Sequence, residues 1–212
     1  DVTTGQELLK LTAASPLAGD SFGASAAIRG NRILIGCPKS DDLGVDSGSV
    51  HVFDLATGQQ LAKLTASDGA PEDRFGSSLA AQGDRVLVGA QLGSGGQGAV
   101  YVFDINTGQE LEKLSAEDGQ PGDWFGVRVA LDGDTAVIGA SGHDGAGADS
   151  GAIYLFDVVT GQQLTKLTAL DGAEGDMFGG SVALSNSRIL IGARGDDDSG
   201  EDSGSAYVLD LA

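Results

Sequence analysis

The chain has 212 residues, with 12 Lys or Arg against 31 Asp or Glu, for a formal net charge of −19. This charge argues against binding to nucleic acid or to an anionic membrane surface, because both contacts need clustered cationic side chains. Apolar residues make up 41% of the chain, enough for a packed core, and no apolar run reaches the length of a membrane span. The single Cys excludes an intrachain disulfide. We therefore expect one acidic globular domain over residues 1–212, without membrane insertion.

Four copies of one repeat of about 50 residues make up the chain. The chain opens on QELLKLTA at residues 6–13, and close variants return at 59–66, 109–116 and 162–169. A Phe-Gly pair occurs once per copy, at Phe22-Gly23, Phe75-Gly76, Phe125-Gly126 and Phe178-Gly179. Self-similarity at this spacing is the signature of a repeat architecture. We place the repeats at about 14–66, 67–116, 117–169 and 170–212, the last completed by 1–13.

Each copy contains four segments with strand character, which follow one another from the Phe-Gly pair onward. The first alternates small or apolar residues with polar ones, as in SSLAAQ at 77–82. The second is β-branched and ends in Gly, as in RVLVG at 85–89, and the third carries aromatic residues, as in GAVYVFD at 98–104. The fourth is the QxLxKLTA segment. Short runs rich in Val, Ile, Leu and aromatic residues, bounded by Gly, Asp or Asn, are typical of β-strands.

Four antiparallel strands in a repeat of this length are typical of a β-propeller blade. The sequence therefore predicts an all-β fold, a propeller of four four-stranded antiparallel blades. Residues 6–13 have the pattern of a fourth strand, and the last copy stops after its third strand at 206–211. We expect the opening segment to complete the last blade, a velcro closure that leaves no unpaired edge. The same strand count permits the alternative that two chains form one eight-bladed ring.

The repeat resembles the FG-GAP repeat, the blade unit of integrin α-subunit propellers and of many bacterial secreted or surface proteins. The resemblance rests on paired segments such as FGSSLA with VLVGAQ and FGGSVA with ILIGAR, each followed by the aromatic strand. It implies a propeller with an adhesion-type binding role outside the cell or on its surface. Two features depart from the family. Family propellers usually have seven blades, and short turns such as QGD at 82–84 replace the integrin-type calcium loop.

The aromatic residues follow the repeat, which indicates a role in packing. The seven Phe occupy two repeat positions, and the three Tyr share a third position with His51. Trp124 is the aromatic residue outside this pattern, and it stands where the preceding copy has Arg74. We therefore name Trp124 and Arg74 as candidate partner-binding residues.

Twenty of the 31 acidic residues fall in loops that enter the first strand of a copy or leave the second. Strand direction alternates within a blade, so we expect these loops on one face. Four of the acids precede the Phe-Gly pairs and are expected to accept hydrogen bonds that fix the loop: Asp20, Asp73, Asp123 and Asp176.

Three loops that leave a second strand share two Asp residues five positions apart around a Gly, a spacing that can bring carboxylates together. Such loops suit Ca²⁺, a hard cation that takes roughly six to eight oxygen ligands. The candidate metal ligands are Asp41, Asp42, Asp46, Asp144, Asp149, Asp197, Asp198 and Asp202. The corresponding loop of the second copy has no acid. The competing interpretation is that these residues form turns and accept hydrogen bonds from backbone N–H groups.

An enzyme needs one asymmetric constellation of groups, whereas the acids here recur from copy to copy. His51 and His143 fall in different copies, without a recognisable Ser or Cys partner in sequence. We therefore expect a non-enzymatic extracellular or cell-surface module that binds a protein or glycan partner through its acidic loops, as a monomer or else a homodimer. A structural or assembly module of recently amplified or engineered repeats is the alternative. A metal-dependent hydrolase or lyase is a second alternative.

Overall fold

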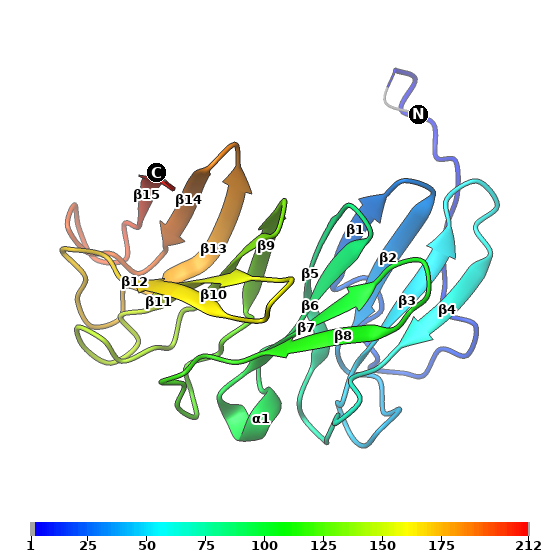
Figure 1. Ribbon diagram of the computed structural model, residues 1–212, viewed down its shortest axis with the longest axis horizontal. Coiled ribbons are helices and arrows are strands. Elements are labelled where there is room, and N and C mark those ends of the chain that lie inside the picture. Colours follow the sequence, from blue (N-terminus) through cyan, green and yellow to red (C-terminus); the bar gives the residue numbers. More distant parts are fainter. Residues whose placement is uncertain (1–2, 212) are drawn as a thin grey trace.

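The computed structural model describes residues 3–211, which form four antiparallel sheets in chain order (Figure 1). The first three sheets have four strands each and the fourth has three. The strands are β1 (Ser25–Arg29), β2 (Arg32–Cys37), β3 (Ser49–Asp54), β4 (Gln60–Leu64), β5 (Phe75–Gln82), β6 (Arg85–Ala90), β7 (Ala99–Asp104), β8 (Glu110–Leu114), β9 (Arg128–Asp132), β10 (Thr135–Ala140), β11 (Ala152–Asp157), β12 (Gln163–Leu167), β13 (Phe178–Ser185), β14 (Arg188–Ala193) and β15 (Ser205–Asp210). One helical turn, α1 (Gly93–Gly96), lies in the acid-free loop between β6 and β7. Within residues 3–211, no helix is long and apolar enough to cross a membrane.

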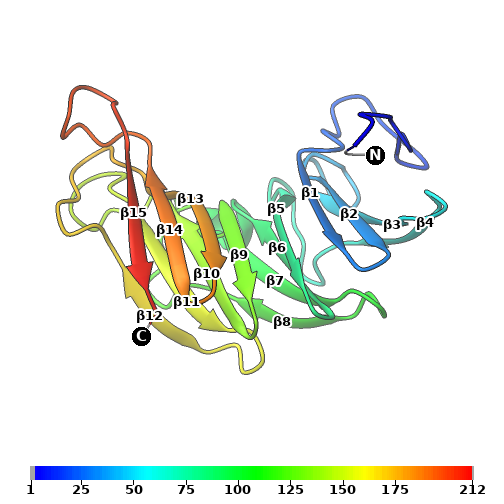
Figure 2. The same cartoon turned by 90° about the horizontal axis from the view of Figure 1, so that it is seen from above.

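The sheets stand side by side along an arc (Figure 2). The first strands β1, β5, β9 and β13 contact one another in series along the concave side, and β4, β8 and β12 lie on the convex side. Consecutive strands pair antiparallel within each sheet. This is the arrangement of propeller blades, so the predicted all-β fold of four blade-like sheets is confirmed.

The core lies between neighbouring sheets. The third strands β3, β7 and β11 are buried along their first five residues, because neighbouring sheets or loops cover both of their faces. β15 instead alternates between half-buried and exposed residues. The fourth sheet therefore has one covered face and one open face.

The Phe of each Phe-Gly pair packs against the aromatic residues of the third strand. Phe75 meets Tyr101 and Phe103 edge-on, with ring centroids 5.5 and 5.7 Å apart. Phe125 makes the same two contacts in the third sheet, at 5.4 and 5.7 Å. Aromatic pairs in this geometry each contribute about 0.5–1.5 kcal/mol beyond the area that they bury. The repeated aromatic residues of the second and third sheets are therefore core residues, as expected.

Adjacent sheets are joined near the loop end of their first strands. The hydroxyl of Ser25 donates to the carbonyl of Gly76 at 2.7 Å, and Ser78 donates to Gly126 of the third sheet at the same distance. The Gly that is the next-to-last residue of each second strand allows the backbones to approach so closely. A Cβ atom there would lie 2.1 or 2.2 Å from the carbonyl oxygen of the next Phe-Gly pair, as at Gly36, Gly89 and Gly139.

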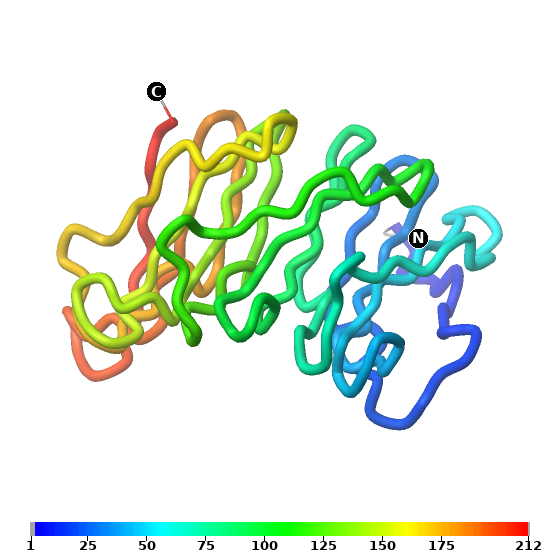
Figure 3. The backbone as a smooth tube through the Cα atoms, turned by 60° about the horizontal axis from the view of Figure 1, so that its bottom comes forward, coloured from blue at the N-terminus to red at the C-terminus, as the bar shows by residue number. Residues whose placement is uncertain are grey.

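The expected velcro closure is not made within one chain. Residues 6–13 are not in a strand, and within residues 3–211 the outer edge of β15 has no partner strand. The first and fourth sheets stand at opposite ends of the arc (Figures 1 and 2), and Figure 3 shows the N-terminal segment beside the first sheet, far from β15. The sequence pattern identifies the type of strand, but closure also depends on the angle between successive sheets.

Candidate binding site at the loop face

Two sets of loops lie on one side of the arc, and we call the surface that they form the loop face. It consists of the loops leading into the first strands (14–21, 67–74, 117–124, 170–177) and the loops following the second strands (38–48, 91–98, 141–151, 194–204). The two sets pack against each other through their backbones. The amide of Arg74 donates to the carbonyl of Asp46 at 3.1 Å, and the amide of Met177 donates to Asp149 at 2.9 Å. The acidic loops therefore share one face, as expected.

The Asp before each Phe-Gly pair closes a turn in the loop that leads into the first strand. Each accepts a backbone N–H three residues earlier, Asp20 from Leu17 at 2.8 Å, Asp73 from Ala70 at 2.7 Å, Asp123 from Gln120 at 2.9 Å and Asp176 from Ala173 at 2.7 Å. Burial raises the pKa of Asp73, and the hydrogen bond from Ala70 opposes this shift. These four acids therefore fix the loop backbone, which was their expected role.

The loops proposed for calcium are held as turns by their own carboxylates. The first Asp of each loop accepts the amide of the last Asp, as Asp41 does from Asp46 at 2.9 Å. The pairs Asp144–Asp149 and Asp197–Asp202 repeat this contact at 2.9 and 2.6 Å.

The other two candidate ligands have separate contacts. Asp42 forms an ion pair with Lys63 at 2.5 Å, and the amide of Asp198 donates to Asp196 at 3.2 Å. Within the described residues, no three His, Cys, Asp or Glu side chains are grouped so that they could hold a metal ion. The observed contacts are those of the turn interpretation.

Trp124 and Arg74 occupy a strained backbone position that recurs in every sheet. The residue before each Phe-Gly pair has a positive φ of 56 to 58°, at Ser21, Arg74, Trp124 and Met177. A residue with a Cβ in this left-handed conformation costs on the order of 1 kcal/mol. The turn closed by the preceding Asp holds this conformation directly before each Phe-Gly pair.

Trp124 lines a pocket of 280 Å³ between the third and fourth sheets. The other lining residues are Gln91, Val127, Arg128, Ser141, Gly180 and Arg194. Trp124 is half-buried, whereas Arg128 and Arg194 are exposed. Nε of Arg194 donates to the sulfur of Met177 at 3.1 Å, which holds the guanidinium at the rim. The pocket therefore combines an indole with two cations beside the acidic loops.

Arg74 is not among the residues that line this pocket. Its Nε is buried and has no hydrogen-bond partner within the described residues. Sequence reasoning missed Arg128 as a site residue, although a signal exists. Arg128 stands where the other three copies have Ser25, Ser78 and Ser181, so it breaks the repeat.

A Lys–Asp–Tyr cluster joins the outer strand to the loop face in the second and third sheets. Nζ of Lys113 donates to Asp68 at 2.6 Å and lies 5.4 Å from the ring centroid of Tyr101, whose hydroxyl donates to Asp68 at 2.7 Å. The hydrogen bond from Lys113 is the main cause that lowers the pKa of Asp68. In the third sheet the same contacts join Lys166, Asp118 and Tyr154, at 2.6, 5.6 and 2.9 Å.

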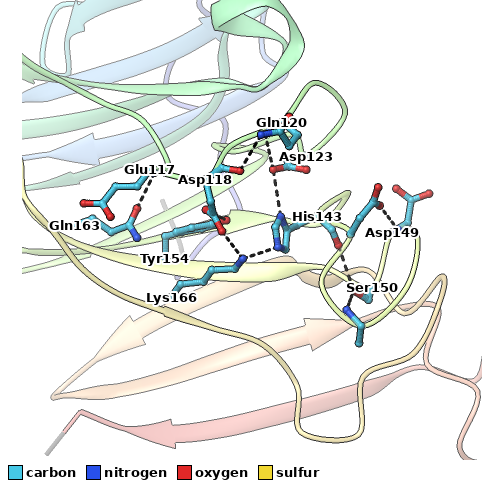
Figure 4. A network of polar contacts seen from close by, with 12 residues as sticks. Glu117, Asp118, Gln120, Asp123, His143, Asp149, Ser150, Tyr154, Gln163 and Lys166 are labelled. Atoms are coloured by element: carbon cyan, nitrogen blue, oxygen red, sulfur yellow. Dashed lines mark hydrogen bonds and ion pairs between the residues drawn. The ribbon is translucent and has the colours of Figure 1, made fainter.

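His143 extends the cluster of the third sheet (Figure 4). Its Nδ1 lies 3.2 Å from Asp123, and its Nε2 lies 2.5 Å from Nζ of Lys166. A charged Lys only donates, so Nε2 accepts and Nδ1 carries the proton that is shared with Asp123. The hydroxyl of Ser150 donates to the carbonyl of His143 at 3.2 Å. Both ring nitrogens therefore have partners, and the cluster ties loops together.

A family model for the FG-GAP repeat matches residues 6–53, 59–103, 109–156 and 162–209. These four matches cover nearly all of the sheets and the loop face. The chain belongs to the FG-GAP repeat family. A search of the curated proteins finds no match.

Two solved structures are similar to this FG-GAP chain. The computationally designed Ika8 protein, in its crystal structure, aligns with 89% of this chain and 45% of its own, at 24% identity and a TM-score of 0.57. Hydrazine synthase of Kuenenia stuttgartiensis aligns with 93% of this chain and 50% of its own, at 16% identity and a TM-score of 0.62. At these identities the likeness shows the fold alone. The FG-GAP chain spans about half the length of each.

Proposed function

We propose that this FG-GAP chain is a non-enzymatic binding module of an extracellular or cell-surface protein, and that it holds a protein or glycan partner at its loop face. The observation that carries the proposal is the pocket in which Trp124 lies with Arg128 and Arg194. The FG-GAP repeat supports the location, because such repeats are typical of extracellular and surface proteins.

The chemistry of the pocket favours a partner that presents a carboxylate beside an apolar or sugar face. An indole offers a rigid surface for stacking, and guanidinium groups bind carboxylates through paired hydrogen bonds. The surrounding acidic loops add specificity, because they repel a uniformly anionic partner and attract one with cationic groups around its carboxylate.

The chain has one Trp, so its fluorescence reports on this pocket directly. The probes are a galacturonate oligosaccharide, a neutral galactose oligosaccharide and an Asp-containing peptide with flanking Lys residues. We expect a saturable change of emission with one carboxylate-bearing probe, and none with the neutral sugar. Arg128→Gln and Arg194→Gln should each weaken binding about tenfold, which corresponds to roughly 1.4 kcal/mol.

Lys39→Gln is the matched control, because Lys39 is an exposed cation of the loop face that does not line the pocket. It should leave the titration unchanged. Absence of any spectral change, or equal loss in all three variants, would overturn the proposed site.

Calcium binding by the three acidic loops is a second proposal. The shared spacing of their Asp pairs supports it, and Asp46, Asp149 and Asp202 have matching backbone conformations, with φ of 54, 53 and 51°. Calcium would have to draw the carboxylates of a loop together, because they are not grouped for a metal within the described residues. Its role would be to stiffen the loop face.

A further inference from the structure

We propose that the open edge of the fourth sheet is the docking site for a second copy of this chain, which donates its residues 6–13 as the missing fourth strand. Two copies joined head to tail at both ends would form a closed ring of eight sheets. This inference concerns assembly, and it is independent of the proposed binding function.

The edge strand β15 lacks the outer partner that the other third strands have among the described residues. In the first three sheets, the third strand pairs on its outer side with a QxLxKL strand, β4, β8 or β12. β15 has no such partner within residues 3–211. Residues 6–13 carry the same pattern and are the copy of it that forms no strand in the described chain. The donor and the acceptor therefore match, but they lie at opposite ends of the arc.

Among the described residues, the fourth sheet has the Asp and the Tyr of a Lys–Asp–Tyr cluster without its Lys. The hydroxyl of Tyr207 lies 3.1 Å from Asp171, the counterpart of Asp68, and 2.8 Å from Asp196, which is the nearer acceptor for its proton. Within the described residues Asp171 has no ion pair. In the observed registers Tyr101 is paired with Lys113, and Tyr154 with Lys166. The same register pairs Tyr207 with Lys10 of the donated strand, so Lys10 would complete the cluster.

The open face of the fourth sheet exposes apolar residues that are buried in the other sheets. Leu190 and Val208 are 49% and 66% exposed, whereas the residues at the same repeat positions in the second sheet, Leu87 and Val102, are fully buried against the third sheet. Leu190 and Val208 line an apolar hollow of 270 Å³. A Cβ on Gly192 would meet Oγ of Ser181, whereas the other second-strand Gly residues face a neighbouring Phe-Gly pair. The fourth sheet therefore has no neighbouring sheet, among the described residues, on the face by which each other sheet contacts the next.

The first sheet has a complementary open face at the other end of the arc. Phe22 is half-buried, whereas the other three Phe of the Phe-Gly pairs are buried. Ile28, in the first strand β1 of the same sheet, is 64% exposed. In a ring, the carbonyl of Gly23 would accept from Ser181 of the other copy, as Gly76 accepts from Ser25. Each end of the arc therefore carries one half of the contact that joins its internal sheets.

The donated segment already lies in position for this role. Leu64 of β4 lies 3.3 Å from the Cβ position of Gly108, which belongs to the next sheet. Leu11 lies 3.4 Å from the Cβ position of Gly58. Residues 6–13 thus lie against the first sheet as the outer strand of a preceding sheet would. If the fourth sheet of a second copy took the place of that preceding sheet, residues 6–13 could pair with its β15 without a large rearrangement.

The test is the solution mass of the chain 1–212 by light scattering and sedimentation equilibrium. We expect a dimer of twice the chain mass of 21.2 kDa. Gly192→Ala should weaken the dimer at least about tenfold, because the added methyl would meet the carbonyl of Gly23 in the other copy. The monomer should keep its fold, because the nearest atom to that methyl is a movable hydroxyl.

A charge exchange tests the register. Lys10→Asp and Asp171→Lys should each weaken the dimer, and the double variant should restore it. The control is Val159→Ser, in the turn between β11 and β12. Val159 is apolar and about as exposed as Leu190, and its substitution should leave the dimer affinity unchanged. Circular dichroism confirms that each variant is folded. A monomeric chain, or a dimer that is insensitive to Gly192→Ala and to the single charge variants, would overturn the proposal.

Discussion

A Cβ atom on Gly89 would lie 2.2 Å from the carbonyl oxygen of Gly126 in the next sheet. This distance is well inside van der Waals contact, so the second and third sheets meet backbone to backbone. Gly89, the next-to-last residue of β6, is therefore required by packing between sheets, and not by a turn within one sheet.

Gly89→Ala should destabilise the chain by about 1–3 kcal/mol, because the methyl group forces two backbones apart in a well-packed core. Gly192→Ala, at the same position of the fourth sheet, should change the unfolding free energy of the separated monomer by less than about 0.5 kcal/mol. Urea unfolding at low protein concentration measures both values. Equal losses in the two variants would contradict the proposed junction geometry.

Trp124→Gly should raise the stability of the monomer or leave it unchanged. The φ of 56° at Trp124 suits Gly, so the substitution relieves strain of about 1 kcal/mol while it removes some partly buried surface. The same variant should lose binding of the carboxylate probe, measured by calorimetry because the fluorophore is gone. A large loss of stability with unchanged binding would mean that Trp124 is a packing residue.

Lys113→Met should raise the pKa of Asp68, because the hydrogen bond from Lys113 is the main cause that lowers it. A depressed pKa in the folded chain stabilises the fold above the ordinary Asp pKa of about 3.9, and this contribution is lost as the pH falls through the folded value. The pair is partly exposed, so the loss at neutral pH should be at most about 1 kcal/mol. Carboxyl NMR titration of Asp68 gives the pKa. The control is Lys10→Met, which should leave the pKa of Asp68 unchanged because Lys10 is not its partner.

If the acidic loops bind calcium, the ion should raise the melting temperature of the chain. At a calcium concentration one hundred times Kd, the free energy of unfolding should rise by about 2.7 kcal/mol. EDTA should reverse the shift, and the triple variant Asp46→Asn, Asp149→Asn, Asp202→Asn should reduce it. Mg²⁺ is the matched control, because it needs a more rigid octahedral site. With no shift at millimolar Ca²⁺, these residues would be turn formers alone.

Most strands could be predicted from the sequence, because each strand type has a pattern that recurs four times. The segments 85–89 and 98–104 coincide closely with β6 and β7. Residues 6–13 are the exception, since they have the pattern of β4 without forming a strand. A strand needs a partner edge for its backbone N–H and C=O groups. Whether that edge is within reach depends on the curvature of the whole arc.

The candidate site was partly predictable for the same reason. Trp124 breaks the repeat, and the structure places it in a pocket. Arg128 and Arg194 come from β9 and from the loop after β14, and their proximity to Trp124 depends on how the third and fourth sheets dock. The partners of His143 could not be predicted either, because they lie 20 and 23 residues away in sequence. Local patterns contain no information on such contacts.

Disulfide trapping tests most directly whether residues 6–13 of one copy pair with β15 of another. The register of Val102 with Glu112 predicts that Val208 faces Leu9 of the other copy. Leu9→Cys with Val208→Cys, in a Cys37→Ala background, should oxidise to a covalent dimer that a reductant releases. Free thiols after oxidation, or thiols consumed within a covalent monomer, would contradict the claim.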